Sequence, residues 1–481
     1  MSKNWNANPS QLLLLRNMRK VEMIEKLEIT GISSTGKAVG RKDDLVIFVN
    51  QGAPGDVIDV MIVGKEKKIL IGSPVFFHKK SLDRTDPFCE HFGICGGCKW
   101  QHLNYPAQLT FKAAHVRENL KKISKMELPE AEPIMGSAET DHYRNKLEYT
   151  FSNKRWLTQE QIQTDEPINK NALGFHIPRM FDKILDINQC HLQPSPSNEI
   201  RLALKKFADT ECFTFYDIKK QQGLLRNLII RTTTTEETMV IVQFGEADEE
   251  KIKKVMQFLA GQFPQLTSLL YLVNLKKNET IYDQNILTYA GKDFINEKMG
   301  DLHFKIGPKS FFQTNPKQAY ELYKKIDAFA DLKGNELVFD LYSGTGTIAN
   351  FLAKNSRKVI GIESVPEAVE DAHFNSKLNQ IDNTEFYAGD MKDMLSGSFI
   401  KAHGRPDLVT ADPPRMGMHQ NVIKALNQLK PDRIIYVSCN PATQARDMEL
   451  MKDHYEVIKT QPVDMFPHTQ HIENIVLLKS K

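Results

Sequence analysis

Apolar and polar positions alternate along the first part of the chain, between Val21 and about Phe77. Glycine, Asp-Asp and Gly-Ala-Pro-Gly turns divide this stretch into four β-rich runs. The runs are VEMIEKLEIT, LVIFVN, DVIDVMIVG and KILIGSPVFF. Short strands that follow one another in this way predict a small β-barrel of the OB-like type, a shape that often binds RNA. A small β-domain without a ligand is the alternative interpretation.

Beyond Gly307 the pattern becomes a regular alternation of strands and helices. The successive segments are NELVFDLYSGTG, TIANFLAKNS, KVIGIES, PEAVEDAHFNSKLNQ, DLVTADPP and RIIYVSCNP. Alternation of this kind predicts βαβ units and a parallel, doubly wound, Rossmann-like sheet. From about Pro133 to Ile306 strands and helices also alternate, but without a nucleotide fingerprint. A helix is expected from Tyr105 to about Ser124, and an exposed loop from Thr158 to Asn171.

We therefore predict an α/β protein in four segments. They are an N-terminal tail or short helix over 1–20, the OB-like barrel over 21–82, a central mixed α+β domain over 83–306 and the Rossmann-like domain over 307–481. A length of 481 residues is consistent with two to four domains.

Composition narrows the class of protein. Hydrophobic residues make up 41% of the chain and charged residues 26%, the proportions of a soluble globular protein. No apolar run approaches the roughly 18–20 residues that span a bilayer, and the start lacks the features of a secretory signal. Six cysteines are too few for a secreted disulfide scaffold, so we expect a reducing cytoplasm. The net charge is only +3, and residues 1–88 carry 14 Lys and Arg against 10 Asp and Glu, a weak basic bias compatible with phosphate contacts.

A glycine loop follows the first strand of the Rossmann-like domain. It reads Asp340-Leu341-Tyr342-Ser343-Gly344-Thr345-Gly346. Glycines at such a strand end let the backbone turn tightly and approach a bound nucleoside. Glu363 lies 23 residues beyond Asp340, at the end of the next strand, where a carboxylate can accept hydrogen bonds from ribose hydroxyls. Sites for NAD, FAD and S-adenosylmethionine (SAM) share this pattern, and a purely structural turn would also use two glycines.

Two later strands end in residues that can carry chemistry. Asp412 opens the string Asp-Pro-Pro-Arg, in which the prolines restrict φ and fix the carboxylate, so that it or its backbone carbonyl can read the edge of a base. Cys439, in Ser-Cys-Asn-Pro, has the same strand-end position, which faces the ligand crevice of a doubly wound sheet. A cysteine thiolate there is a strong nucleophile. A structural turn at Asp412 and an inert buried thiol at Cys439 are the alternatives.

Glu473 stands near the end of the chain in the string FPHTQHIEN. The spacing of His468, His471 and Glu473 matches neither a helical i, i+4 pair nor the H-E-x-x-H metal motif. We therefore predict that Glu473 acts as a general base and that the histidines are positioning or structural residues. An ordinary surface charge is the alternative.

Four cysteines are spaced like metal ligands. Cys89, Cys95 and Cys98 lie close together in the sequence, with two glycines between the last two, and Cys190 is the obvious fourth ligand. Sites made only of sulfur hold zinc or iron–sulfur clusters, and the spacing alone does not choose between them. Cys212 lies in a strand-like context and is not expected to be a ligand.

These strings resemble those of the RNA uracil-C5 methyltransferases that carry an N-terminal TRAM domain and an iron–sulfur cluster, of the 23S ribosomal RNA (uracil-5-)-methyltransferase type. The resemblance covers almost the whole chain. It rests on CEHFGICGGCKWQHLNYPAQLTFK, YRNKLEYTF, LRNLIIRT, FFQTNP, DLYSGTGT, DPPR, SCNP and HTQHIEN. One departure is Ser343, where the family commonly has cysteine. That position is not thought to be catalytic, so the departure puts little in doubt.

The resemblance implies SAM-dependent C5-methylation of a uridine in structured RNA, with 23S ribosomal RNA favoured and transfer RNA possible. It implies that Cys439 is the nucleophile and Glu473 the base. It implies a monomer without membrane association. It also implies a 4Fe–4S cluster and a set of SAM contacts. The cluster ligands would be Cys89, Cys95, Cys98 and Cys190, and the SAM contacts Gln313, Tyr342, Glu363 and Asp412.

Two other classes of function compete with this interpretation. An iron–sulfur oxidoreductase could use the glycine loop for NAD or FAD, but it would have no use for the Asp-Pro-Pro-Arg and Ser-Cys-Asn-Pro strings together. A non-catalytic RNA-binding protein could retain a dead methyltransferase domain, but the intact Cys439 and Glu473 argue against it. A comparison of SAM and NAD in a thermal-shift assay would separate the first of these from the methyltransferase.

Overall fold

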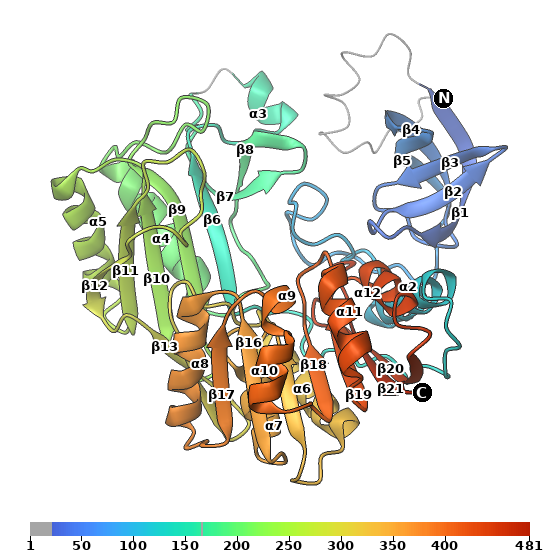
Figure 1. Cartoon of the computed structure of the whole chain (residues 1–481). Coiled ribbons are helices and arrows are strands. Elements are labelled where there is room, and N and C mark those ends of the chain that lie inside the picture. Colours follow the sequence, from blue (N-terminus) through green and yellow to red (C-terminus); the bar gives the residue numbers. More distant parts are fainter. Residues whose placement is uncertain (1–21, 165–166) are drawn as a thin grey trace.

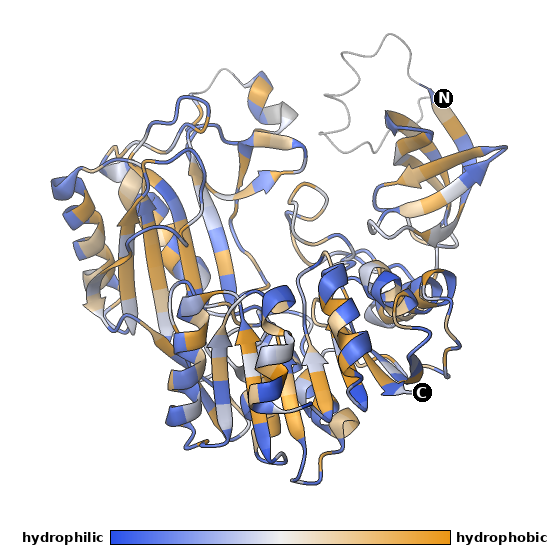
Figure 2. Cartoon of the chain, in the orientation of Figure 1, coloured by the Kyte–Doolittle hydropathy of each residue, from blue (hydrophilic) through white to orange (hydrophobic). Residues whose placement is uncertain are grey.

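The computed structural model describes residues 22–164 and 167–481, so the tail predicted over 1–20 lies outside the described residues. The described chain forms a small barrel, a central sheet and a C-terminal sheet flanked by helices (Figure 1). Most strands of the two large sheets are apolar, whereas the helices over them carry many polar residues (Figure 2). No helix in these two ranges is long and apolar enough to cross a membrane.

Five strands close into the predicted barrel. They are β1 (Met23–Ile32), β2 (Ala38–Lys42), β3 (Leu45–Val49), β4 (Val57–Glu66) and β5 (Ile69–Lys79), in the order β1-β2-β3-β5-β4. Ile29, Ile47 and Val60 fill the barrel interior. A Cβ at Gly72 would lie 2.1 Å from the Val60 side chain, so the strands can approach there only because residue 72 is glycine. The sequence pattern did not predict β2, which is short and half polar.

The helix predicted from Tyr105 to about Ser124 is confirmed as α2 (Tyr105–Ile123), with the Asn104 side chain capping its first turn. It packs on the C-terminal sheet, although its residues fall within the predicted central domain. Val116 and Leu120 join the apolar core on one face of that sheet. Lys112 forms a fully buried ion pair with Asp464 at 2.6 Å. The helix therefore ties the cysteine-bearing segment before it to the C-terminal part of the chain.

The central sheet has seven strands, ordered β12-β11-β10-β9-β6-β7-β8. They are β6 (Lys146–Ser152), β7 (Ala172–Ile177), β8 (Met180–Asp186), β9 (Leu225–Thr232), β10 (Thr238–Phe244), β11 (Ser268–Val273) and β12 (Leu287–Gly291). Helices α4 (Ser197–Thr210) and α5 (Glu249–Gln262) pack on one face through residues such as Leu204 and Leu259. The other face, with Ile229 and Ile241, shares a core with the C-terminal part. Both faces are thus buried, which explains the apolar run Met-Val-Ile-Val in β10.

A short helix, α3 (Gln159–Gln163), interrupts the stretch predicted to be an exposed loop. Thr158 and Gln161 form a capping box at its start, which stabilises the first turn of so short a helix. The hairpin of β13 (Ile295–Met299) and β14 (Leu302–Ile306) then leads to the C-terminal sheet. The N–H of Lys305 donates to the Asn375 side chain at 2.8 Å, so the hairpin contacts the helices of the Rossmann-like part.

The C-terminal sheet is doubly wound, as predicted, in the order β17-β16-β15-β18-β19-β21-β20. Its strands are β15 (Leu337–Leu341), β16 (Lys358–Glu363), β17 (Thr384–Ala388), β18 (Leu408–Ala411), β19 (Arg433–Ser438), β20 (Tyr455–Val463) and β21 (Glu473–Ser480). Its helices are α6 (Pro316–Ala330), α7 (Thr347–Ala353), α8 (Pro366–Leu378), α9 (Met391–Met394), α10 (Gly397–His403), α11 (Gln420–Leu429) and α12 (Pro441–Glu449). The first five strands of the order are parallel, and β21 runs antiparallel to both β19 and β20.

Candidate active site

The predicted site residues of the C-terminal part gather at one edge of its sheet. The strand order reverses between β15 and β18, and a parallel sheet opens its ligand crevice at such a point, beyond the carboxyl ends of the strands. The glycine loop follows β15, Asp412 follows β18, and Cys439 follows β19. Glu473 opens β21 and reaches the same edge from the opposite direction, because that strand is antiparallel.

The glycine loop turns in the left-handed backbone region. Tyr342, Gly344 and Gly346 have φ values of 62°, 53° and 77°. Gly346 is also crowded, since a Cβ there would lie 2.9 Å from the Phe386 ring. Tyr342 is not glycine, and such a conformation is uncommon enough in other residues to suggest a functional constraint on this turn.

Glu363 holds the glycine loop against the start of α8. One carboxylate oxygen accepts a hydrogen bond from the Gly344 N–H at 3.0 Å. The other accepts from the N–H groups of Ser364 (2.7 Å) and Val365 (3.0 Å). Its role toward a ribose stays a prediction, but the carboxylate lies at the loop where that role needs it.

Acidic side chains cluster where β15 and β18 end. Asp340 is buried and accepts a hydrogen bond from the Thr410 hydroxyl at 2.6 Å, while its second oxygen has no partner among the described residues. Desolvation raises the pKa of Asp340 to about 7, and it also raises the pKa of Asp412 above its usual range. No motif in the sequence assigns Asp340 a role, although a charged residue in the apolar strand Leu-Val-Phe-Asp-Leu is unusual enough to indicate one.

Cys439 and Glu473 face each other across two strand ends. Ser438 pairs with Asn474 in the β19–β21 ladder, so one further step of the same register places Cys439 opposite Glu473. Desolvation, together with the negative charges of Glu473 and Asp412, raises the pKa of Cys439 to about 11. Burial and the nearby Asp412 raise the pKa of Glu473 well above its usual range. Burial thus acts against the charged forms of both the thiol and the carboxyl.

Arg415 is a basic residue that opposes the rise in the pKa values of Cys439 and Glu473. The positive charge of its guanidinium lowers the pKa of the Cys439 thiol and the pKa of the Glu473 carboxyl. The Asn440 side chain and the Thr443 hydroxyl each donate to the Arg415 carbonyl at 3.1 Å. The Ser-Cys-Asn-Pro turn thus fastens the Asp-Pro-Pro-Arg turn beside it. In the sequence, Arg415 stands out only as the last residue of the Asp-Pro-Pro-Arg motif, and no function for it follows from that position.

The two histidines of the last loop are neutral. Burial and neighbouring cations lower the pKa values of His468 and His471 to about 4. A neutral imidazole with so low a pKa is a weak base, which fits the positioning or structural role expected for both.

Gln313 lies between the central and C-terminal sheets, before α6. Its side chain is buried, and its backbone carbonyl accepts a hydrogen bond from the Asn145 side chain at 3.1 Å. The Asn145 N–H donates to the next carbonyl, that of Thr314, at 2.8 Å. Asn145 immediately precedes β6, so the central sheet helps to fix this loop.

The four cysteines predicted as ligands come together from two segments. Burial raises the pKa values of Cys95 and Cys98 to about 11 and about 12, and the thiols of Cys89 and Cys190 add to both shifts. The groups are therefore close enough to sense one another's charge. Cys212 is exposed in a turn after α4, not in a strand. Over residues 22–164 and 167–481, no three His, Cys, Asp or Glu side chains form a site for a metal ion.

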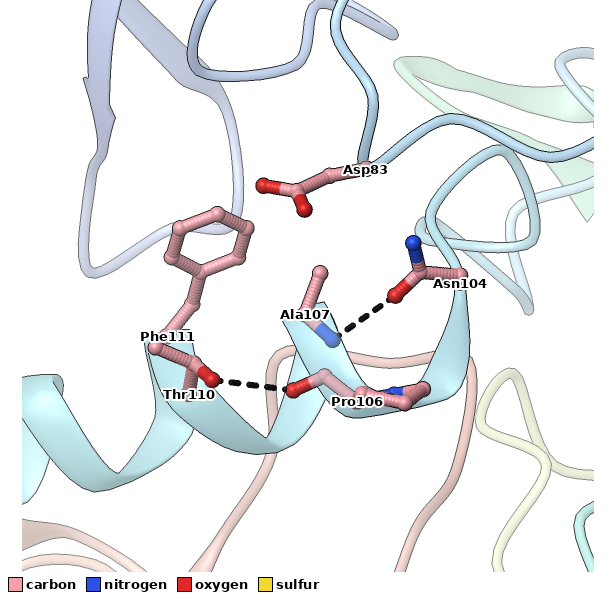
Figure 3. A pocket seen from close by; sticks show the side chains of 6 residues that line it. All are labelled: Asp83, Asn104, Pro106, Ala107, Thr110 and Phe111. Atoms are coloured by element: carbon pink, nitrogen blue, oxygen red, sulfur yellow. Dashed lines mark hydrogen bonds between the residues drawn. The ribbon is translucent and has the colours of Figure 1, made fainter.

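Two surface hollows lie away from these residues. The first, of about 360 Å³, is drawn in Figure 3 at the start of α2, where the Thr110 hydroxyl donates to the Pro106 carbonyl and Ala107 donates to Asn104. The second, of about 480 Å³, lies beside the β13–β14 hairpin and is lined by residues that include Leu302. Neither contains a predicted site residue.

Comparisons with known proteins show what this chain is similar to. Residues 230–481 match the family model described as tRNA (uracil-5-)-methyltransferase. A protein of Bacteroides thetaiotaomicron named as an uncharacterized RNA methyltransferase is 54% identical, over 93% of this chain and 100% of the relative. Another so named, from Chlorobaculum tepidum, is 37% identical over 95% and 96%. The crystal structure of Pyrococcus abyssi tRNA (uracil-54, C5)-methyltransferase in complex with S-adenosyl-L-homocysteine is 31% identical with a TM-score of 0.73, over 94% of this chain and 100% of that one.

Proposed function

The chain belongs to the tRNA (uracil-5-)-methyltransferase family, and from this premise we propose that it is a SAM-dependent enzyme that methylates C5 of a uridine in structured RNA. The observation that carries the proposal is the placement of Cys439 opposite Glu473 at the ends of β19 and β21. This pair presents a nucleophile and an acid–base group at the edge where Asp412 lies. The family assignment favours this activity over the NAD- or FAD-dependent oxidoreductase.

Cys439 is proposed to activate a carbon that is by itself a poor nucleophile. Its sulfur forms a bond to C6 of uracil, and the electron pair of the C5–C6 double bond moves to give an enolate with carbanion character at C5. SAM, when bound, supplies the methyl group that C5 takes. Arg415 favours the thiolate because its positive charge lowers the pKa of the thiol. Covalent catalysis of this kind divides one difficult step into easier ones.

Glu473 is proposed to complete the reaction by removing the C5 proton. When the C5–H bond breaks, its electron pair re-forms the C5–C6 double bond, and the C6–S bond breaks with its pair returning to the Cys439 sulfur. A carboxylate whose pKa is raised by burial is a stronger base than an exposed one, which suits Glu473 to this step. Asp412 would hold the uracil ring while nearby donors stabilise the enolate.

The glycine loop and its neighbours are proposed to bind SAM through Gln313, Tyr342, Glu363 and Asp412. Two observations fit this assignment. The turn from Tyr342 to Gly346 is held in the left-handed region, which brings backbone close to a ligand. Glu363 lies at the strand end next to that turn and keeps it in place through the Gly344 N–H.

Substitution of Glu363 tests this part of the proposal. Glu363→Ala removes both the proposed ribose contact and the hydrogen bond to Gly344, so SAM should bind more weakly by about 1.5–3 kcal/mol, as expected for a charge-assisted hydrogen bond. RNA affinity should barely change. Calorimetry with SAM measures the effect, and Glu367→Ala, an exposed carboxylate in the first turn of α8, is the matched control. Unaltered SAM affinity would remove Glu363 from the site.

The RNA target is proposed to be 23S ribosomal RNA, which the sequence resemblance favours. Transfer RNA is the second candidate, because the Pyrococcus abyssi neighbour is named for uracil 54 of tRNA. The barrel, whose five-strand closure fits a TRAM domain, would contact phosphates and offset part of the few kcal/mol that flipping a base out of folded RNA costs. A monomeric state and a cytoplasmic location stay predictions.

A map of methylated uridines tests the function and the target together. RNA from cells with the gene and from cells without it should differ at one or a few C5-methyluridines. Loss of a 23S site supports ribosomal RNA as the target, and loss of a transfer RNA site supports the second candidate. Identical maps would contradict the proposed function.

We also propose that Cys89, Cys95, Cys98 and Cys190 hold a 4Fe–4S cluster. The donor set fits, because all four ligands are thiols and the charges of their thiolates act on one another. The four thiolates would hold the cluster through their sulfurs. Cys95 and Cys190 pack in the same apolar cluster, which would shield such a group from water.

Iron analysis tests the cluster. Anaerobically purified protein should be brown and contain about four irons per chain, the number in a cubane. Cys190→Ser should lower the iron content, whereas Cys212→Ser, a change at the exposed cysteine after α4, should leave it unchanged. Stoichiometric zinc without iron in the same preparation would contradict the assignment.

A further inference from the structure

His468 is held by distant segments in the middle of the loop that leads into Glu473. Its backbone carbonyl accepts hydrogen bonds from the N–H groups of Lys99 at 2.8 Å and Trp100 at 2.9 Å. Its own N–H donates to the Gln108 side-chain oxygen at 2.8 Å. Its ring Nδ1 lies 3.2 Å from the Gln108 amide nitrogen. The Phe88 ring also meets the imidazole edge-on, with ring centroids 5.1 Å apart.

Gln108 of α2 connects the partners of His468 to one another. Its side chain is fully buried, and its amide nitrogen contacts the carbonyls of Trp100 at 3.2 Å and Leu103 at 2.9 Å as well as the imidazole. The amide nitrogen carries two hydrogens and has these three acceptors within reach, so the Gln108 side chain joins the imidazole to the carbonyls of Trp100 and Leu103. Lys99 follows Cys98 directly, so the segment that Gln108 joins to the loop is the cysteine-bearing one.

The backbone of His468 is held in a conformation that it would not adopt freely. Its φ is 64°, in the left-handed region that residues other than glycine rarely adopt. Such a conformation persists only where the surroundings impose it. Here the surroundings are the four polar contacts to Lys99, Trp100 and Gln108.

Glu473 is positioned from its two sides by different groups. On the C-terminal side, the Asn474 side chain donates to Gln444 at 2.8 Å, and the Gln444 amide donates to the Asn474 carbonyl at 3.1 Å. On the N-terminal side, Ile472 is buried in the apolar core, and the loop before it is fixed at His468. A displaced His468 would therefore move one of the two anchors of Glu473.

Cys439 is held by contacts that do not include His468. The Ser438 hydroxyl accepts from the Asn440 N–H at 3.1 Å, and Asn440 in turn donates to Arg415. The Gln444 amide donates to the Tyr436 carbonyl of β19 at 2.9 Å. These contacts lie within the C-terminal part and involve neither α2 nor the cysteine-bearing segment.

We propose that His468 is a positioning residue for the proton-abstracting carboxylate, and that Gln108 with the segment at Lys99 and Trp100 fixes it in place. The inference rests on the proposed function and deepens it. The integrity of the cysteine-bearing segment sets the rate at which the C5 proton passes to Glu473. It does not set the rate at which the Cys439 sulfur bonds to C6.

Two RNA substrates separate these two steps. With ordinary uridine RNA and SAM, His468→Ala should turn over about a hundred-fold more slowly, the size of effect that a misplaced catalytic group can cause. Protein joined covalently to methylated RNA should accumulate on denaturing gels. With 5-fluorouridine RNA no base can remove the substituent at C5, so the adduct forms without the deprotonation step, and His468→Ala should trap it at the wild-type rate.

Matched variants distinguish positioning from a general loss of structure. His468→Asn should restore most of the turnover, because asparagine tolerates a positive φ and its side-chain oxygen can accept from Gln108 as Nδ1 does. Gln108→Leu should behave like His468→Ala. Gln193→Leu, which removes a buried amide bonded to Ile230 and Ser197, should turn over normally. Hydrogen exchange at the Lys99 and Trp100 amides should speed up in His468→Ala, because loss of the imidazole contact with Gln108 loosens the residue whose carbonyl these amides bind.

The outcomes separate this inference from the proposed function. Normal turnover by His468→Ala, or equal slowing with uridine and 5-fluorouridine RNA, would overturn the positioning role while the methyltransferase activity stands. Failure of the wild-type protein to form any adduct or to methylate any RNA would instead contradict the proposed function.

Discussion

Replacement of Cys439 by alanine is expected to abolish both methyl transfer and the covalent complex with RNA. The reason is chemical, since without a thiolate no bond forms to C6, and C5 does not gain carbanion character. The change removes one sulfur from a turn that Ser438 and Asn440 continue to hold, so SAM and RNA should still bind. Methyl incorporation from labelled SAM and denaturing gels with labelled RNA measure the two losses.

The exposed Cys212 provides the control for this experiment. Cys212→Ala removes a thiol outside the site and should leave methylation and adduct formation unchanged. Methylation of RNA by Cys439→Ala, or a covalent complex formed by that variant, would show that the nucleophile is another group.

Glu473→Gln is expected to stop the reaction at a later point. Addition and methylation should proceed, but C5 keeps its proton because an amide is not a base, and the protein stays covalently joined to methylated RNA. Turnover should fall by at least about a hundred-fold, the lower range of a general base contribution. The exchange keeps the size and burial of the side chain, so the β19–β21 ladder should persist.

Denaturing gels with SAM and RNA separate the two variants directly. A shifted band is expected for Glu473→Gln and none for Cys439→Ala. Glu456→Gln, a change at an exposed residue of β20, is the control and should turn over like the wild type. Normal turnover by Glu473→Gln would place the base elsewhere. His471 would then be the next candidate, although its pKa of about 4 makes it a weak one.

Much of the fold could be predicted because its strands and helices differ in pattern. The alternation of apolar and polar residues predicted four of the five barrel strands. The alternation of strands and helices predicted the doubly wound sheet. The missing strand β2 reads Ala-Val-Gly-Arg-Lys and has too few apolar residues to stand out. It becomes a strand because the barrel must close, and that requirement comes from the neighbouring strands, not from residues 38–42.

The pairing that defines the site could not be predicted in the same way. The position of Cys439 follows from its place after a parallel strand. That of Glu473 depends on β21, which lies between β19 and β20 and runs antiparallel to both. The pattern of a strand does not show which strands it pairs with or in which direction it runs. The motif at Glu473 therefore indicated a base, but not how far that base lies from the Cys439 thiol.

The other features that the sequence did not predict depend on contacts between residues far apart in the chain. Nothing local in α2 indicates that Lys112 will pair with Asp464, or that Gln108 will bind His468. These partners lie more than 350 residues apart in the sequence. The raised pKa of Asp340 likewise depends on burial and on Asp412, which only the assembled sheet brings near.

The fate of the hydrogen at C5 tests the central claim most directly. RNA that contains uridine labelled with tritium at C5 should be incubated with the purified protein and SAM labelled with carbon-14 in its methyl group. If the enzyme methylates C5 through the Cys439 adduct, one tritium should be released to water for each methyl group incorporated, and Cys439→Ala should give neither. Methyl incorporation without tritium release would place the methyl group elsewhere on the RNA and contradict the account.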